Sequence, residues 1–320
     1  MVGDERELSF KNLVQSLQLN LQNYLIRDWQ MLKKYIVCLA LGCLFYNLSF
    51  AQDREIAITI DDLPFVGSCN NNPAKLKREN DRFMQILQTL ISKNVPATGF
   101  VIAGSIEKGQ WELLEQFRQA GFKLGNHTYS HKSLNSVTAE KYIDDVDRAD
   151  KVLTPLFPEH KYFRYPYLAE SSGEKKQAVY DYLAAHNYTV APVTIDSKDF
   201  VFNQQLFAIP YRLRDKNLNQ LKKRYLAFIW SQTLKAESRA AKANPNKPVK
   251  HILLIHANLL NSHFLGDIID LYQQNGYRII SLEEALTAPA EAINTPAGEN
   301  ERYEMFFNDS VLRSLFNQKS

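Results

Sequence analysis

Between residues 55 and 282 the chain alternates short apolar runs with longer segments whose apolar residues recur about every 3.6 positions. The short runs are typical of buried strands, and the longer ones predict amphipathic helices. The expected strands are 55–60, 97–104, 122–127, 162–167, 189–196, 251–256 and 277–282. The expected helices are 76–91, 111–120, 142–153, 174–186 and 263–275. Such alternation favours a parallel sheet or a (β/α) barrel.

Two segments interrupt this alternation. Residues 203–250 form a long insertion that is strongly helical in its middle and ends in the turn-rich stretch NPNKP. After Pro289 the chain has the composition of a linker or a loosely attached tail. We therefore expect one catalytic domain over 52–288, with the helical insertion at about 203–250, and a C-terminal tail over 289–320.

The N-terminal region has the layout of a signal peptide over 31–51. Two lysines precede an apolar run from Tyr35 to Tyr46, and Ser49-Phe50-Ala51 supplies a small-x-small cleavage site. The run is too short to span a bilayer comfortably, so no stable membrane span is expected after processing. The alternatives are a retained N-terminal anchor and lipidation at Cys43.

These features predict an exported protein, periplasmic or extracellular. Residues 1–30 have no role in this scheme, and we interpret them as a non-native upstream extension before a start at Met31.

Composition narrows the classes of partner and of metal site. The net charge is +3 with both signs interspersed, whereas a nucleic-acid-binding protein usually carries a concentrated basic stripe. We therefore expect no nucleic-acid partner. Removal of the signal peptide would leave Cys69 as the only cysteine, which excludes an internal disulfide and a Cys-rich zinc site.

Two adjacent carboxylates, Asp61 and Asp62, end the first expected strand. Burying them side by side is costly unless a cation lies nearby. His127 and His131 have the i, i+4 spacing that places two imidazoles on one side of a helical turn. Functional groups gather at the carboxyl ends of strands in such barrels, and two His with one carboxylate form a zinc set with an open position. The sequence thus predicts a divalent-metal site that uses one of the two aspartates.

Three further signals follow expected strands. Arg164, on a buried strand, needs a carboxylate partner, which Asp196 or Asp199 could supply. His256 follows an apolar strand directly. We interpret the remaining histidines as structural: His160, His186, His251 and His263.

Five motifs occur in the order TIDD, H-T-x-x-H, R-x-P-Y, D-x-x-D-F and L-I-H. Together they resemble the motifs of the NodB-type polysaccharide deacetylases, carbohydrate esterase family 4, over residues 55 to about 286. The resemblance implies a distorted (β/α) barrel, here with the helical insertion before the last strands. The chain departs from the family pattern at Phe200, where Trp is usual, at Leu63-Pro64, where Gly-Pro is usual, and in the length of the insertion.

The resemblance also implies a metal set and a base. Asp62, His127 and His131 would hold Zn²⁺, or Co²⁺ or another divalent transition metal. Asp61 would be the general base. Arg164 would orient this base.

The remaining roles are implied in the same way. Asp199 would hold Arg164, and His256 would be the general acid. The backbone N–H of Tyr167 would contribute to the oxyanion hole and contact the substrate. Leu254 would line the acetyl pocket, with Phe200 beside the substrate.

The implied function is a metal-dependent hydrolase that removes N-acetyl groups from an acetylated amino-sugar glycan and releases acetate. Peptidoglycan, chitin oligosaccharides and a glucosamine polymer all remain candidate substrates. An O-acetyl carbohydrate esterase of the same family would use the same residues. A catalytically inactive carbohydrate-binding protein should have lost a ligand or an acid–base residue, and none is missing here.

Overall fold

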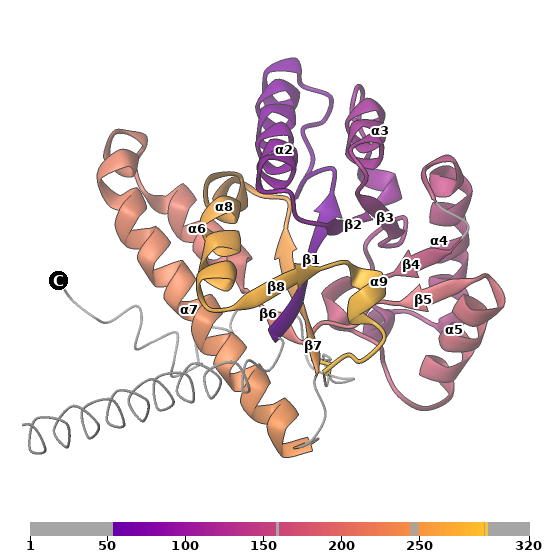
Figure 1. Cartoon of the computed structure of the whole chain (residues 1–320). Helices are drawn as coiled ribbons and strands as arrows, with labels where there is room; N and C mark the ends of the chain where they lie inside the picture. The colour runs from indigo at the N-terminus through magenta and orange to yellow at the C-terminus, as the bar shows by residue number, and fades with distance from the viewer. Residues whose placement is uncertain (1–53, 158–159, 244, 246–248, 291, 294–320) are drawn as a thin grey trace, which may run out of the picture. The chain divides into compact units, whose positions relative to one another are not determined.

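The computed structural model describes residues 54–157, 160–243, 245, 249–290 and 292–293 (Figure 1). The predicted signal peptide, the upstream extension and residues 294–320 of the predicted tail lie outside these residues and stay predictions. Within the described part, no helix combines the length and apolarity needed to cross a bilayer.

Eight parallel strands form one sheet in the order β5-β4-β3-β2-β1-β7-β6, and β8 pairs with β1 beside this path. No pairing joins β5 to β6 among the described residues, so the sheet does not close into a full barrel. It is a curled half-barrel, which confirms the expected distorted (β/α) barrel. The strands are β1 Arg54–Leu63, β2 Ala97–Val101, β3 Lys123–Asn126, β4 Lys161–Phe163, β5 Tyr188–Val190, β6 Ile195–Asp196, β7 Lys250–His256 and β8 Tyr277–Ile280.

Strand β1 is central and is buried on both faces. Ile58 and Ile60 face the main hydrophobic cluster, in which side chains of α2, α7 and α8 also pack. Ala57 faces the opposite way, toward Phe100 and Ile252. Burial on both faces explains why this strand is a nearly continuous apolar run rather than an alternating one.

Helices cover the outside of the sheet (Figure 1). Several begin at a side-chain cap: Asn72, Thr138 and Asn258 each accept a hydrogen bond from a backbone N–H in the first turn. The helices are α2 Pro73–Lys93, α3 Trp111–Gln119, α4 Ala139–Leu153, α5 Gly173–Ala185, α6 Asp199–Ala208, α7 Arg214–Ala243, α8 Leu259–Gln274 and α9 Leu282–Ala285.

The insertion is part of the domain core. Its helical structure begins with α6 at Asp199, before the expected start at 203. The 30-residue helix α7 buries Leu221, Tyr225 and Phe228 in the main cluster. The insertion therefore covers one face of the sheet with packed side chains, where solvent would otherwise lie.

Several sequence-based boundaries differ from the structure. The strands expected over 97–104 and 162–167 end earlier, at Val101 and Phe163. The strand expected over 189–196 is two strands, β5 and β6, separated by four residues. The tail expected to be loose from Pro289 is attached at its start: Pro289 bridges to Lys250, and Ile293 N–H donates to the Val193 carbonyl. These backbone hydrogen bonds extend the domain beyond 288, and composition alone could not reveal them.

Candidate active site

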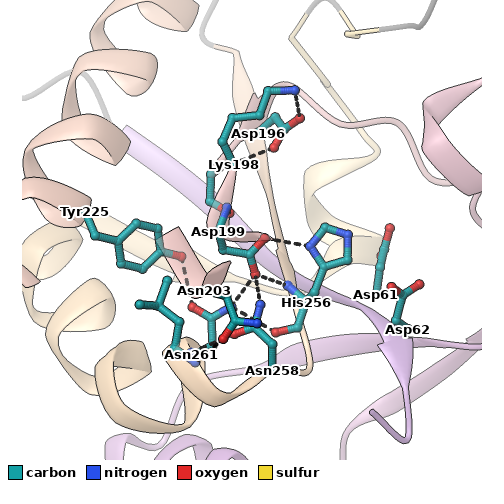
Figure 2. Close-up of polar contacts among 12 residues, drawn as sticks. Asp61, Asp62, Asp196, Lys198, Asp199, Asn203, Tyr225, His256, Asn258 and Asn261 are labelled. Atoms are coloured by element: carbon teal, nitrogen blue, oxygen red, sulfur yellow. Dashed lines mark hydrogen bonds and ion pairs between the residues drawn. The ribbon is translucent and has the colours of Figure 1, made fainter. Parts of the chain in front are cut away.

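The two carboxylates of TIDD lie at the carboxyl end of β1. The pairing of β1 with β2 shifts register between Ile60 and Leu63, and Asp62 adopts a left-handed conformation with φ 62°. Such an irregularity re-aims a side chain that would otherwise point to the other face of the strand. Figure 2 shows Asp61 and Asp62 side by side, near the ring of His256.

The two histidines follow β3, but not on a helical turn as their spacing suggested. Residues 127–131 form a tight loop in which Thr128 and His131 both have positive φ. The Thr128 hydroxyl closes this loop by accepting a hydrogen bond from His131 N–H at 3.0 Å. The loop still brings the two imidazole rings together, with 4.9 Å between the ring centroids of His127 and His131.

Asp62, His127 and His131 converge as a possible metal-binding group among the described residues. Asp62 Oδ1 lies 3.2 Å from His131 Nε2 and 3.5 Å from His127 Nε2. Ligand atoms about 2.0–2.1 Å from one tetrahedral ion lie roughly 3.3–3.5 Å from one another. The three side chains therefore fit a divalent cation.

A second observation supports this fit. Asp62 Oδ1 is buried and has no hydrogen-bond partner within the described residues, which is costly for a carboxylate oxygen. His127 Nδ1 lies 2.8 Å from the Arg164 carbonyl, so it donates there and leaves the Nε2 lone pair toward Asp62. Burial lowers the pKa of His127 well below its usual value, which favours the neutral, metal-binding form.

Arg164 pairs with Asp61 at the interior of the half-barrel. Its Nη1 lies 3.3 Å from both carboxylate oxygens, and Nε donates to the Ala191 carbonyl at 2.7 Å. Nη2 reaches the Thr59 hydroxyl and the Pro192 carbonyl. Arg164 thus orients Asp61, and it also stabilises the segment that connects β5 and β6 through hydrogen bonds to that segment's carbonyl groups. Burial raises the pKa of Asp61 to about 6, although the Arg164 charge opposes this shift.

The structure corrects the partner expected for Asp199. This residue does not hold Arg164: its Oδ1 accepts from His256 Nδ1 at 2.7 Å, and its Oδ2 accepts from His256 N–H at 2.7 Å. The reason is that α6 begins at Asp199, which directs the carboxylate toward β7. Asp196 pairs with Lys198 instead.

The Asp199 carboxylate is saturated with donors (Figure 2). Besides His256, Asn258 Nδ2 donates to Oδ2 at 2.8 Å and Asn261 Nδ2 donates to it at 2.5 Å. Burial lowers the pKa of His256, but the charge and hydrogen bond of Asp199 outweigh it and raise that pKa to about 10. The sequence analysis missed both asparagines, although Asn258 is the residue before an apolar helix, where a cap is expected.

The remaining predicted residues lie around the same end of the sheet. Tyr167 has a left-handed backbone with φ 59°, and its ring centroid lies 4.6 Å from that of His131. Leu254 is buried with Leu168 and Val193. The Phe200 ring stands edge-on to His256, with 6.3 Å between centroids.

A polar groove of about 690 Å³ adjoins His131. Two loops line it, residues 65–71 and 102–108, together with Tyr129 and Ser130. The Glu107 carboxylate holds the first loop in place by accepting hydrogen bonds from Ser68 Oγ and from the backbone N–H groups of residues 69–71. The volume is in the range of sites that bind small molecules.

The curled parallel sheet thus carries a candidate metal centre at its carboxyl edge. Beside this centre lie two carboxylates, each paired with a basic side chain: Asp61 with Arg164, and Asp199 with His256. Residues 51–191 match the polysaccharide deacetylase family model. The chain is 26% identical over 147 residues to a peptidoglycan-N-acetylglucosamine deacetylase from Bacillus cereus, covering 46% of each sequence. It is 27% identical over 164 residues to a chitin deacetylase from Colletotrichum lindemuthianum, covering 49% of this chain and 57% of the relative.

The chain thus spans about half the length of the curated relatives it matches. Among solved structures, a CE4 family pseudoenzyme from Bacillus anthracis superposes with a TM-score of 0.51 at 15% identity, over 76% of this chain and 69% of that one. A polysaccharide deacetylase from Bacillus cereus superposes with a TM-score of 0.50 at 18% identity, over 71% and 91%. These similarities place residues 51–191 in the polysaccharide deacetylase family.

Proposed function

We propose that this protein is an exported, metal-dependent hydrolase that removes N-acetyl groups from an acetylated amino-sugar glycan and releases acetate. The observation that carries the proposal is the placement of the Asp62–His127–His131 cluster beside the Asp61–Arg164 and Asp199–His256 pairs. The curated relatives are named for N-acetylated sugar substrates, which supports the choice of an amide.

Asp62, His127 and His131 would hold Zn²⁺ or Co²⁺. When bound, such an ion acts as a Lewis acid and lowers the pKa of water toward neutrality. Asp61 accepts the proton of the attacking water, because its carboxylate lies beside the cluster and Arg164 orients it.

His256 supplies the second proton transfer. An amine is a poor leaving group, so a protonated imidazole is needed to donate to its nitrogen as the bond breaks. Asp199 keeps the imidazole protonated and fixes the ring through Nδ1. The Tyr167 backbone N–H donates to the carbonyl oxygen as it gains charge, and Leu254 contacts the acetyl methyl group.

The groove beside His131 gives room for sugar units next to the one that is deacetylated. An extended glycan of the peptidoglycan, chitin or glucosamine-polymer type suits such a groove better than a free monosaccharide. An O-acetyl esterase would use the same machinery on an easier bond, and the substrate panel below separates the two activities.

The deciding experiment measures acetate release from metal-loaded protein on chitin oligosaccharides, peptidoglycan, an N-acetylated glucosamine polymer and O-acetylated xylan. We expect release from at least one N-acetylated glycan and loss of that activity after chelation. Release from the xylan alone would favour the esterase. Absence of release from every substrate, in protein with a full complement of metal, would favour the inactive binding protein.

A further inference from the structure

Helix α7 of the insertion, whose length departs from the family pattern, reaches the acid pair through a buried tyrosine. Tyr225 is fully buried and packs against Phe202 of α6, with 5.1 Å between ring centroids. Its hydroxyl donates to Asn261 Oδ1 on α8 at 2.9 Å. Figure 2 shows Tyr225 and Asn261 on the side of Asp199 that faces away from Asp61 and Asp62.

Asn261 is also fully buried, and its side-chain amide forms hydrogen bonds to both Tyr225 and Asp199. Nδ2 donates to Asp199 Oδ2 at 2.5 Å and to the His256 carbonyl at 2.9 Å. The reversed amide would set its oxygen against a carboxylate and a carbonyl, neither of which has a proton to donate. The Tyr225 hydroxyl, as a donor to Oδ1, stabilises the orientation in which Asn261 donates to Asp199.

We propose that Tyr225 and Asn261 are positioning residues for the general acid, and that α7 sets the orientation of His256 through the chain Tyr225–Asn261–Asp199. This inference rests on the proposed function. By donating to Oδ2, Asn261 holds the carboxylate with Oδ1 toward His256 Nδ1. Because the Tyr225–Asn261 and Asn261–Asp199 hydrogen bonds are both buried, a missing donor is not replaced easily by solvent.

Loss of either residue should therefore lower the rate of the step that needs the acid. A positioned acid contributes about 10²- to 10⁴-fold, and misorientation forfeits part of this. We expect Tyr225→Phe to lower kcat on an N-acetylated glycan about 5- to 10-fold, and Asn261→Ala about 100-fold, with KM little changed in both.

The leaving group distinguishes positioning from a general loss of structure. An aryl acetate expels a phenolate that leaves without a proton, so its hydrolysis does not depend on His256. We expect both variants to keep their rate on 4-nitrophenyl acetate within about twofold of the wild type, since the metal cluster and Asp61 are untouched.

Tyr272→Phe is a matched control. Tyr272 on α8 is fully buried, and its hydroxyl lies 2.8 Å from Thr233 Oγ1 on α7. Within the described residues it makes no hydrogen bond to Asp199 or Asn261. The control loses the same kind of hydroxyl between the same two helices, and we expect it to retain full kcat on both substrates.

Equal kcat values for Tyr225→Phe and Tyr272→Phe on the glycan would overturn the inference while leaving the proposed function intact. An equal loss on glycan and aryl acetate would overturn it too, because that pattern means general damage. Tyr225→Phe retains all packing atoms of the ring, so it decides the matter even if Asn261→Ala fails to fold. If the wild-type protein is inactive on every glycan, the proposed function is wrong, and the inference that rests on it is wrong as well.

Discussion

The two halves of the candidate site satisfy their polar groups in opposite ways. In the metal half, Asp62 Oδ1 is buried without a hydrogen-bond partner among the described residues, and two imidazole Nε2 atoms face it. In the acid half, the Asp199 carboxylate accepts four hydrogen bonds. The first arrangement is costly until a cation completes it, whereas the second is complete without any ligand.

Under the proposed function, this difference matches the different tasks of the two halves. A metal-binding group must keep its lone pairs available, so the protein contacts it at few atoms. At His127 the contact is to Nδ1, the ring nitrogen that does not face Asp62. An acid must keep a proton and a fixed ring, so its partner carboxylate is held from several sides. Asp61 lies between the halves, 3.7 Å from His127 Nε2 and paired with Arg164.

The largest effect is expected in the metal half. Asp62→Asn removes the only charged ligand of the cluster, so bound metal and activity should both be lost. Elemental analysis and zinc titration of the purified, folded variant check this. Chelation of the wild type should give the same inactive state, restored by Zn²⁺ or Co²⁺. Full metal occupancy in Asp62→Asn would contradict the assignment of this half.

Asp61→Asn should separate the neighbouring acids. The amide retains the size of the base but cannot accept a proton, so we expect a loss of about 10²- to 10⁴-fold in kcat with metal retained. Metal content measured in parallel with that of Asp62→Asn is the check. If the two variants hold equal amounts of zinc, the division of roles between Asp61 and Asp62 is wrong.

In the acid half, Asp199→Asn should change the pH dependence. The pKa of His256 is raised to about 10, so the wild-type imidazole stays protonated at neutral pH and loses its proton only as pH rises through that value. Without the Asp199 charge, burial lowers the pKa of His256, and the proton is lost at lower pH. We expect about a 100-fold loss of activity at neutral pH.

The measurement is the alkaline limb of kcat/KM against pH, which should move to lower pH in Asp199→Asn. Asp196→Asn is the control, because Asp196 pairs with Lys198 and makes no hydrogen bond to His256 in the described structure. An unchanged limb in Asp199→Asn would show that the acid half does not work through this carboxylate.

The smallest effect is expected at the boundary of the two halves. Arg164→Lys keeps a positive charge beside Asp61 but loses the planar fork that also reaches Thr59 and the Ala191 carbonyl. We expect about a 10-fold loss of kcat, with metal content and the alkaline limb unchanged. Kinetics and a metal assay on the same preparation test this. A lost metal ion would mean that Arg164 supports the cluster through His127 rather than the base.

Much of the metal half was predictable from the sequence. Parallel strands bring their carboxyl ends to one edge, so residues that end β1 and follow β3 are expected to be neighbours. Local spacing then identifies Asp61, Asp62, His127 and His131. The i, i+4 pattern was right about their proximity and wrong about the helical turn, because Thr128 and His131 take positive φ values that spacing does not encode.

The acid half was decided by tertiary structure. The sequence by itself determined the order of strands and helices and the residues at the strand ends, since both follow from local periodicity and short motifs. It could not determine that Asp199 binds His256 rather than Arg164, because the direction of that carboxylate depends on where α6 begins and on donors from α8. Nor could it place Tyr225 next to Asn261. Contacts between residues tens of positions apart arise only when helices pack, and periodicity records which face of a helix is buried but not which side chain it meets.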